Sequence, residues 1–402
     1  MSQSEVLERR GEYLPKVKLA GGAGVEREWK ENEVFEHGLE DVRFQKEDVF
    51  KDVGADFLVG AFASWEIDIW RKLRNAKDAA VQRFLASVEG QRFAITNLVA
   101  EVAENYYDLL ALDNQLVVLR QNIALQQQAL EGVRAQKLAG RVTELAVKRF
   151  EAEVMKNQSL VSLTQQKIVA TENRLNLLVG RFPQPVARDA TNFTRRTPPV
   201  VHLGEPRQLL ENRPDIKQAE FALEAAKLDV EVARAQFYPS LEINAGVAVR
   251  SAFKLAAFPT DPWALVYGIA AHFMQPLFNR NAIEASYLSA NAAQMQAVWN
   301  FERALVTAYG EVATKLARVG NLQASYALKS QEVARRVESI EVSGQLFQSA
   351  RADYVEVLLT RREALDAEME LIETRAQQMQ AMVQLYRALG GGWRGVTQDQ
   401  EP

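Results

Sequence analysis

The residue types that most often carry out chemistry are few in this chain, and they are scattered. The three histidines lie far apart, and none has a carboxylate or a second histidine at metal-ligand spacing: His37, His202 and His272. The chain has no cysteine, which excludes disulfides, thiolate metal sites and thiol nucleophiles. The run 21–24 (Gly-Gly-Ala-Gly) lacks the Lys-Ser/Thr pair of a phosphate-binding loop, and we interpret it as small residues in a crowded strand. The sequence therefore predicts no catalysis, no cofactor and no metal site.

Composition and charge narrow the class of protein. Of the 402 residues, 48% are apolar and 25% are charged, as in ordinary folded proteins. The 48 basic and 52 acidic residues give a net charge of −4, which argues against a nucleic-acid binder with its basic stripe. There is no run of about 18 apolar residues that could form a membrane-spanning helix. The first residues lack the basic-then-apolar layout of a signal peptide, so we expect the chain either to be cytosolic or to lack its leader.

An internal repeat organises the chain. The segment 137–140 corresponds to 347–350, and 179–180 corresponds to 389–390, both at an offset of 210 residues. We predict a first repeat at 1–186, a proline-rich connector at 187–212, a second repeat at 213–393 and a tail at 394–402. In the first repeat we expect strands at about 13–29 and 53–66 and helices at about 68–136 and 143–179. In the second we expect a helix at about 214–236, strands at about 239–252 and 263–276, and helices at about 280–346 and 353–389.

The four predicted strands alternate between apolar and other residues, which is the period of a β-strand. The clearest is 241–250; in 57–67 the alternation is broken by Leu58 and Phe62. Each run is about 10 residues long, as in a tilted strand that crosses a bilayer, although a soluble sandwich sheet would also alternate. Four strands leave two open edges, which lipid does not tolerate, so in a membrane at least two chains would have to pool their strands, and three would give twelve.

In two segments apolar residues recur with a heptad period, and each segment is longer than the helices of a globular domain. At about 68–136 and 280–346 the apolar positions recur every seven residues, which indicates left-handed supercoiling against neighbouring helices. At about 1.5 Å per residue, each helix would run roughly 100 Å. Polar positions such as Asp113 interrupt the stripe. We interpret this as a helix with one solvent-facing side and one packed side, as in a hollow helical tube. The plainest alternative is a cytosolic rod-like coiled coil.

Several separated segments resemble the TolC-type outer-membrane efflux proteins, the outer-membrane factors of tripartite efflux pumps. The sequence Arg-Pro-Asp-Ile at 213–216 opens a helix that is followed by Tyr-Pro-Ser-Leu at 238–241. Further matches to the family's strand-to-helix junctions and C-terminal end lie at 65–70, 275–278 and 385–393. The resemblance spans about residues 5–393. Proline has a φ preset for a first helical turn and aspartate complements the helix dipole, so we interpret Arg213, Pro214 and Asp215 as structural. We also interpret Gln275 and Pro276 as structural, because they open a sharp strand-to-helix passage that places aromatic residues at the membrane interface.

The resemblance implies a mainly α fold with a small transmembrane β part and an internal duplication. Each chain would contribute four strands to a trimeric twelve-stranded β-barrel in the outer membrane, and its helices to a long coiled-coil α-helical barrel that forms a tunnel in the periplasm. The implied partners are two further copies of the chain in a homotrimer, outer-membrane lipid, a periplasmic adaptor protein and an inner-membrane pump, with no nucleic acid. The family has more chain before the first strand, including a leader, so we interpret this sequence as N-terminally truncated. A glycine that is common in the family after Trp70 is Arg71 here.

The turn at 347–356 resembles the periplasmic tip of the family, where aromatic and charged residues close the tunnel. Phe347 matches the aromatic position and Glu356 the acidic ring, whereas Arg351 and Asp353 lie near the matching positions. A three-fold ring of Glu356 would concentrate negative potential in a narrow mouth and favour cations. These four residues are the candidate tunnel gate. The alternative is that their charges only solvate a helix turn.

The sequence therefore predicts a passive exit duct in the outer membrane of a Gram-negative bacterium. With an adaptor and a pump it would export small molecules such as drugs or metal ions. Two alternatives stay open: the outer-membrane duct of a type I protein-secretion system, and a cytosolic coiled-coil scaffold. No ligand pocket is visible in the sequence, so the cargo is not indicated.

Overall fold

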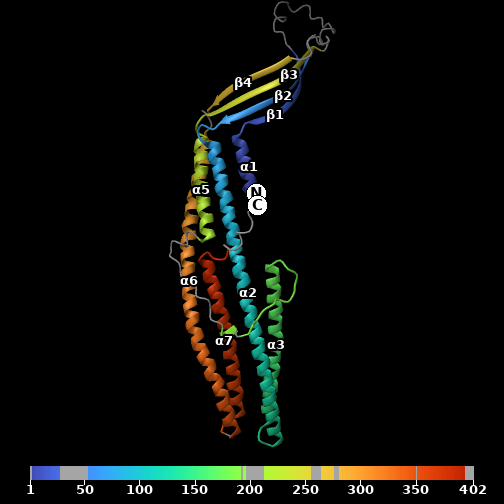
Figure 1. Cartoon of the computed structure of the whole chain (residues 1–402), viewed down its shortest axis with the longest axis vertical. Coiled ribbons are helices and arrows are strands. Elements are labelled where there is room, and N and C mark those ends of the chain that lie inside the picture. The colour runs from blue at the N-terminus through green and yellow to red at the C-terminus, as the bar shows by residue number, and fades with distance from the viewer. Residues whose placement is uncertain are drawn as a thin grey trace, which may run out of the picture. The chain divides into compact units, whose positions relative to one another are not determined.

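The computed structural model of this protein describes residues 2–27, 53–191, 193–195, 212–254, 264–275, 280–349 and 351–393. The first elements are α1 (Ser2–Tyr13), β1 (Lys16–Arg27), β2 (Val53–Ile67), α2 (Lys72–Leu138), α3 (Glu144–Leu178) and the short helix η2 (Phe193–Arg195). They are followed by α5 (Pro214–Ala235), β3 (Ser240–Lys254), β4 (Ala264–Met274), α6 (Asn281–Gln348) and α7 (Tyr354–Ala388) (Figure 1). The predicted fold class, mainly helical with four strands, is confirmed for these residues. Pro276, the tail at 394–402 and most of the connector lie outside them.

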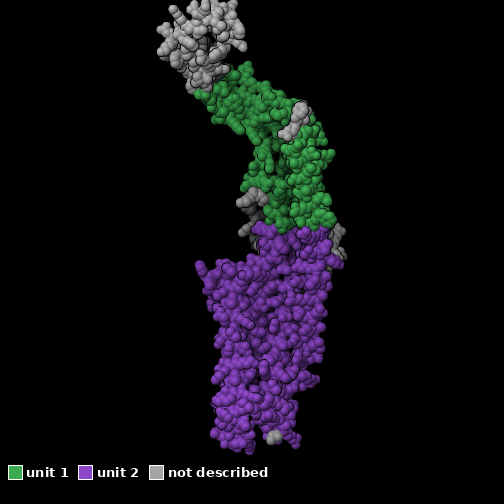
Figure 2. Space-filling model, turned by 180° about the vertical axis from the view of Figure 1, so that it is seen from behind, with its two compact units in different colours: residues 1–88, 218–301 green, residues 89–217, 302–402 purple. Residues whose placement is uncertain are grey.

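The chain divides into two compact units that differ from the predicted repeats. Unit 1 contains residues 1–88 and 218–301, and unit 2 contains 89–217 and 302–402 (Figure 2). Two of the three boundaries fall inside the long helices α2 and α6, because these helices, with 67 and 68 residues, are longer than one hydrophobic core and their two ends pack on different elements. The third falls near the start of α5. The division into repeats at 1–186 and 213–393 stays a prediction.

Unit 1 contains a four-stranded antiparallel sheet in the order β1-β2-β3-β4. Figure 1 shows the strands side by side, with α1, α5 and the first part of α2 below them. Arg83 of α2 pairs with Glu5 of α1 at 3.3 Å and with Asp229 of α5 at 2.5 Å, which marks these helices as neighbours. Within the described strands, β1 and β4 are the edges of the sheet, and each has a neighbour on one side only.

The register of the sheet separates odd-numbered from even-numbered residues. Leu19 pairs with Ala61, Ala61 with Val247, and Val247 with Tyr267, so odd positions share one face across all four strands. On this odd face large apolar side chains are exposed: Val17, Leu19, Val59, Val247, Leu265, Tyr267, Ile269 and Phe273. A sheet with one outward apolar face is the arrangement expected for strands that meet lipid.

The passage from β2 into α2 is fixed by Asp68, which is only 8% exposed. Its carboxylate accepts hydrogen bonds from the backbone N–H groups of Leu73 at 3.1 Å and Arg74 at 2.9 Å, as a helix cap does. Trp70 stacks on Tyr238 with the ring centroids 4.8 Å apart, and its indole N–H donates to the carbonyl of Pro239 at 2.9 Å. The β2–α2 junction is therefore bonded to the α5–β3 junction.

Arg71, in the middle of this passage, has a φ of +60°. A left-handed conformation costs an L-residue with a Cβ atom about 1–2 kcal/mol, and glycine avoids most of that cost. We expect Arg71→Gly to raise the free energy of unfolding by up to about 1 kcal/mol. Thermal unfolding followed by circular dichroism would measure the change. Arg71→Ala is the control, since it removes the side chain but keeps the Cβ atom; equal stability of the two variants would contradict the prediction.

The helices of unit 2 turn back with the same backbone hydrogen bond in both repeats. At the α2–α3 turn, the N–H of Arg141 donates to the carbonyl of Gln136 at 2.9 Å, next to Gly140 at φ +70°. At the α6–α7 turn, the N–H of Arg351 donates to the carbonyl of Leu346, also at 2.9 Å. This bond satisfies a terminal carbonyl where a helix ends. The 210-residue offset seen in the sequence is thus preserved in the backbone at the two turns.

A buried amide pair lies between α2 and α3. The side-chain amide of Asn157 donates to Gln126 Oε1 at 2.8 Å, and the two residues are 0% and 1% exposed. A polar pair inside an apolar seam lowers stability but specifies how two helices align. None of the helices in the described ranges is both long and apolar enough to span a membrane.

Candidate functional site

The buried motif residue Arg213 is the centre of an ionic cluster in unit 2. It is 5% exposed, and it donates two parallel hydrogen bonds to the carboxylate of Asp215, at 3.0 and 2.7 Å. It also donates to the carbonyl of Ala388 at 2.7 Å and to Glu311 Oε2 at 3.0 Å. Arg387 pairs with the other oxygen of Glu311 at 3.0 Å. We call Arg213, Asp215, Glu311 and Arg387 the anchor cluster.

The anchor cluster links the start of α5 to α6 and to the end of α7. Burial alone would lower the pKa of Arg213, but the hydrogen bonds and charges of Asp215 and Glu311 outweigh it and hold this pKa above its ordinary value. The two arginines and two carboxylates balance in charge, and every member is paired. Such a cluster joins helices and leaves no free group for a ligand, which agrees with a structural role for the motif.

The turn after α7 closes over this cluster because Gly390 permits it. Gly390 has a φ of +81°, and a Cβ atom there would lie 2.6 Å from the carbonyl oxygen of Asn212. The indole N–H of Trp393 donates to that same oxygen at 3.3 Å, and the guanidinium of Arg92 lies 4.6 Å from the centroid of the Trp393 ring. The C-terminal segment of the predicted motif therefore packs on the residue before Arg213.

The other two motif positions are not joined to this cluster. Gln275 directly follows β4 in unit 1 and is exposed, and Pro276 lies outside the described residues. His272 lies on β4, whereas His37 and His202 are not described. In the part of the chain that the structure covers, no three His, Cys, Asp or Glu side chains are arranged to hold a metal ion.

The four candidate gate residues surround the α6–α7 turn. Phe347 lies in the last turn of α6 and is half-buried, Arg351 and Asp353 lie in the connecting turn, and Glu356 lies in the first turn of α7. The three charged side chains are exposed. Asp353 occupies the N-cap position, but its side chain makes no capping hydrogen bond. None of the three forms an ion pair with another described residue of its own chain.

The helix ends beside the α2–α3 turn carry paired charges, whereas Arg141 in the turn itself is exposed and has no ion-pair partner among the described residues. Arg134 contacts Glu131 and Glu151, both at 2.9 Å. Lys148 contacts the same Glu151 at 3.0 Å, and Lys137 pairs with Glu144 across the turn. The two turns thus have related backbones, and each presents an exposed arginine without an ion pair, Arg141 or Arg351. They differ in their acidic residues, because Glu144 and Glu151 are paired within the chain whereas Asp353 and Glu356 are not.

The two turns are neighbours in unit 2. An apolar cluster joins α2 and α3 just before and after their turn: Leu130, Val133, Ala146, Val147 and Phe150. Tyr354 and Leu358, from the first turns of α7, pack against this cluster. The start of α7, which carries Glu356, is therefore supported by the first turn through apolar contacts.

The sequence did not reveal how the connector binds to the helices. Arg188 forms ion pairs with Asp113 of α2 and Glu172 of α3, and the three side chains are 16–20% exposed. The interpretation of Asp113 as part of a solvent-facing helix side was therefore wrong, because its carboxylate is bound by Arg188.

A second contact of the connector is centred on Thr194. Its carbonyl accepts hydrogen bonds from the Tyr326 hydroxyl of α6 at 2.6 Å and from Arg375 of α7 at 3.0 and 2.6 Å. The guanidinium of Arg375 also lies 3.6 Å from the centroid of the Tyr326 ring. Phe193, next to Thr194, is fully buried in an apolar cluster with residues of α2 and α7. The described residues 187–191 and 193–195 of the connector are thus a packed part of unit 2.

Comparison with known proteins gives one consistent family. Residues 2–181 and 206–391 match the family described as outer membrane efflux protein. The cation efflux system protein CusC of Escherichia coli O6:H1 is 28% identical over 341 residues, which cover 84% of this chain and 73% of that protein. The pyoverdine export outer membrane protein OpmQ of Pseudomonas aeruginosa is 28% identical over 347 residues, which cover 86% and 72%.

The fold comparison agrees with the sequence comparison. A crystal structure of CusC matches with a TM-score of 0.83 and 25% identity, covering 98% of this chain and 88% of that chain. The matched residues include both long helix pairs, all four strands and the anchor cluster. This chain therefore belongs to the outer membrane efflux protein family.

Proposed function

We propose that this chain assembles as a homotrimer into an exit duct, with twelve pooled strands in the outer membrane and a helical tunnel in the periplasm. A periplasmic adaptor and an inner-membrane pump would drive small molecules such as drugs or metal ions through it. Since the family is one of outer-membrane proteins, the alternative of a cytosolic coiled-coil scaffold is wrong.

The observation that carries the proposal is the pair of edge strands beside an exposed apolar face. β1 and β4 each have an unpaired side within the described sheet, and the odd face exposes Leu19 and Tyr267 by 87% and 81%. Lipid can cover the apolar face but cannot bond to the edges, so β1 of one copy has to pair with β4 of the next. Pairing of this head-to-tail type gives a ring when the rotation between successive copies closes, as the proposed trimer requires.

The long helix α6 supports the same assembly. Large apolar side chains are 40–74% exposed on it at successive spacings of 7, 4, 7, 3 and 7 residues: Leu288, Met295, Trp299, Val306, Tyr309 and Leu316. Heptad spacing on an exposed stripe is typical of a helix that packs against another helix. A neighbouring copy of this chain offers such helices.

Edge pairing can be tested directly, because the chain has no cysteine of its own. We expect Leu19→Cys in β1, combined in turn with cysteine at Leu265, Tyr267 or Ile269 in β4, to give covalent dimers and trimers with a short bifunctional maleimide in lipid. Within one chain β2 and β3 separate the two edges by about 14 Å, which a short linker does not span. Denaturing electrophoresis reads the result.

The matched control joins two strands that are neighbours within one chain. Val59 of β2 and Val249 of β3 are direct partners, so Val59→Cys with Val249→Cys should crosslink only within the chain and migrate as a monomer. If every β1–β4 combination also migrated as a monomer, the pooled barrel would be refuted.

We place the resting closure of the duct at the α6–α7 turn. In support, Arg351, Asp353 and Glu356 are exposed and have no ion-pair partner among the described residues of their own chain, so facing copies of the same turn can provide partners. Phe347 would supply the apolar part of the closure. The α2–α3 turn, whose flanking charges are already paired, would be the fixed support.

The names of the relatives bear on the size of the cargo. CusC belongs to a cation efflux system, and OpmQ exports pyoverdine. Both names favour small cargo over the protein cargo of a type I secretion duct. They name different cargoes, so the identity of the exported molecule has to come from the lining of the duct itself.

A further inference from the structure

The even face of the sheet carries one aromatic side chain opposite a lysine. In the register of the strands, Lys18 of β1 pairs with Phe62 of β2, Phe62 with Gly246 of β3, and Gly246 with Gly268 of β4. These four residues form one row across the sheet, on the face opposite the exposed apolar residues. The sequence showed Leu58 and Phe62 only as breaks in the alternation of β2, and the register assigns both to this even face.

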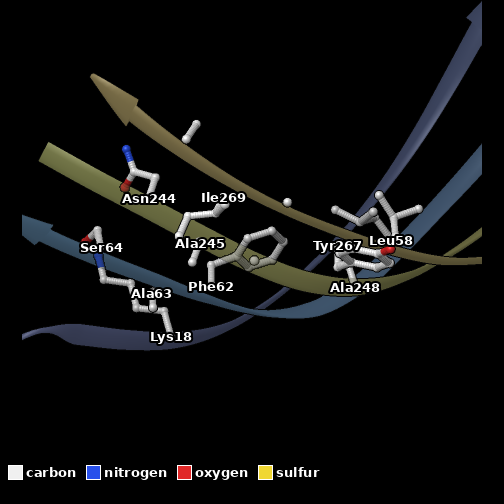
Figure 3. Close-up of a pocket in the computed structure, with 14 residues that line it drawn as sticks. Lys18, Leu58, Phe62, Ala63, Ser64, Asn244, Ala245, Ala248, Tyr267 and Ile269 are labelled. Carbon is white, nitrogen blue, oxygen red and sulfur yellow. The ribbon is translucent and has the colours of Figure 1, made fainter. Parts of the chain in front are cut away.

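Glycines on β2 and β3 keep the surface around Phe62 hollow. A Cβ atom at Gly246 would lie 2.9 Å from Cδ1 of Phe62, so the ring lies directly over this glycine. A Cβ atom at Gly60 would lie 2.4 Å from Cβ of Ala248, so that position is also closed to a larger residue. A hollow of about 510 Å³ remains on this part of the sheet, which is the volume of a small-molecule site (Figure 3).

The hollow has a polar end and an apolar end. Figure 3 shows Lys18, Ser64 and Asn244 at one end, Leu58 and Ala248 at the other, and the ring of Phe62 between them. Lys18 is exposed and forms no ion pair with a described residue. A cation beside two hydrogen-bonding side chains matches an anionic group, and a flat ring over glycine matches a flat apolar body.

From this geometry we infer that the hollow binds amphipathic anions with a carboxylate on a flat apolar body. The carboxylate lies at Lys18, Ser64 and Asn244, and the apolar body stacks on Phe62 toward Leu58. The inference rests on the proposed function for its setting, because a closed barrel would turn this face toward the passing cargo. It names a cargo class that the duct retains briefly on its way out.

The test uses naphthoate as the probe, with the full chain in lipid nanodiscs and fluorescence anisotropy as the readout. Naphthylmethylammonium has the same ring with the opposite charge, and empty nanodiscs report partition into lipid. Phe62→Ala should weaken naphthoate binding about tenfold, since it removes the stacking surface. Lys18→Met should weaken it about three- to fivefold and abolish the preference for the anion.

Lys227→Met is the charge-matched control. Lys227 lies on α5, pairs with Glu224 at 2.7 Å and does not line the hollow. Its removal deletes the same charge and should change binding less than twofold. Equal naphthoate binding in the wild type and all three variants, or equal losses in Lys227→Met and Lys18→Met, would overturn the inference.

A second measurement separates this inference from the proposed function. In planar bilayers naphthoate should block the ion current of the wild type and block the Phe62→Ala variant more weakly. Residue-specific binding without any block would support the hollow as a site but count against its place inside a duct. A conducting duct without residue-specific binding would support the duct and refute the site.

Discussion

An Arg213→Met variant is expected to lose about 3–5 kcal/mol of the free energy of unfolding. Arg213 is 5% exposed, and its removal leaves the carboxylates of Asp215 and Glu311, which are 25% and 24% exposed, with fewer partners. It also leaves the carbonyl of Ala388 without its donor. The cost arises mainly from these uncompensated, partly buried groups, and only in part from the lost attraction itself. Chemical denaturation of the detergent-solubilised protein would measure it.

Two further variants make this expectation specific. Arg213→Lys keeps the charge but cannot donate the two parallel bonds to Asp215, so its stability should fall between wild type and methionine. Arg335→Met removes a side chain that is 81% exposed and paired with Glu338 on the same helix, and it should change stability by less than about 0.5 kcal/mol. If Arg213→Met were no less stable than Arg335→Met, the anchor cluster would not have the structural role assigned to it.

Replacing Arg351 and Glu356 together by glutamine is expected to raise the resting ion conductance of the assembled duct about tenfold. An exposed ion pair contributes on the order of 0.2–1 kcal/mol, and three symmetric copies would together contribute up to about 3 kcal/mol to the closed state. About 1.4 kcal/mol already changes a two-state population tenfold. Planar-bilayer recordings of the intact oligomer would show the difference.

The α2–α3 turn provides the control for the gate. Lys148→Met with Glu151→Gln removes an ion pair that is formed within one chain, at 3.0 Å, and should leave the resting conductance unchanged. A conductance of Arg351→Gln/Glu356→Gln equal to that of wild type, with the oligomer intact, would remove the α6–α7 turn as the gate. Its charges would then only solvate the turn.

The sequence alone determined the elements and the fold class. Alternation with period two identified the strands, including 241–250 within β3, and the heptad stripe identified α2 and α6. The motif at Arg213-Pro214-Asp215 indicated a helix start, and α5 begins at Pro214. These features are local. Periodicity shows which residues of one helix or strand share a face, and the start of a helix depends on the residue types in its first turn.

Only the tertiary structure decided which elements meet. Glu311 and Arg387 lie far from Arg213 in the sequence, and no periodic pattern predicts that they meet in one cluster. The heptad pattern predicted that Asp113 faces solvent, but the structure shows its carboxylate in an ion pair with Arg188. The register of β2 against β1 and β3 assigned Phe62 to the even face, where the sequence showed only broken alternation. In each case the contact depends on how separate helices and strands pack together in space. The local sequence around one residue does not specify which residue of another element will contact it.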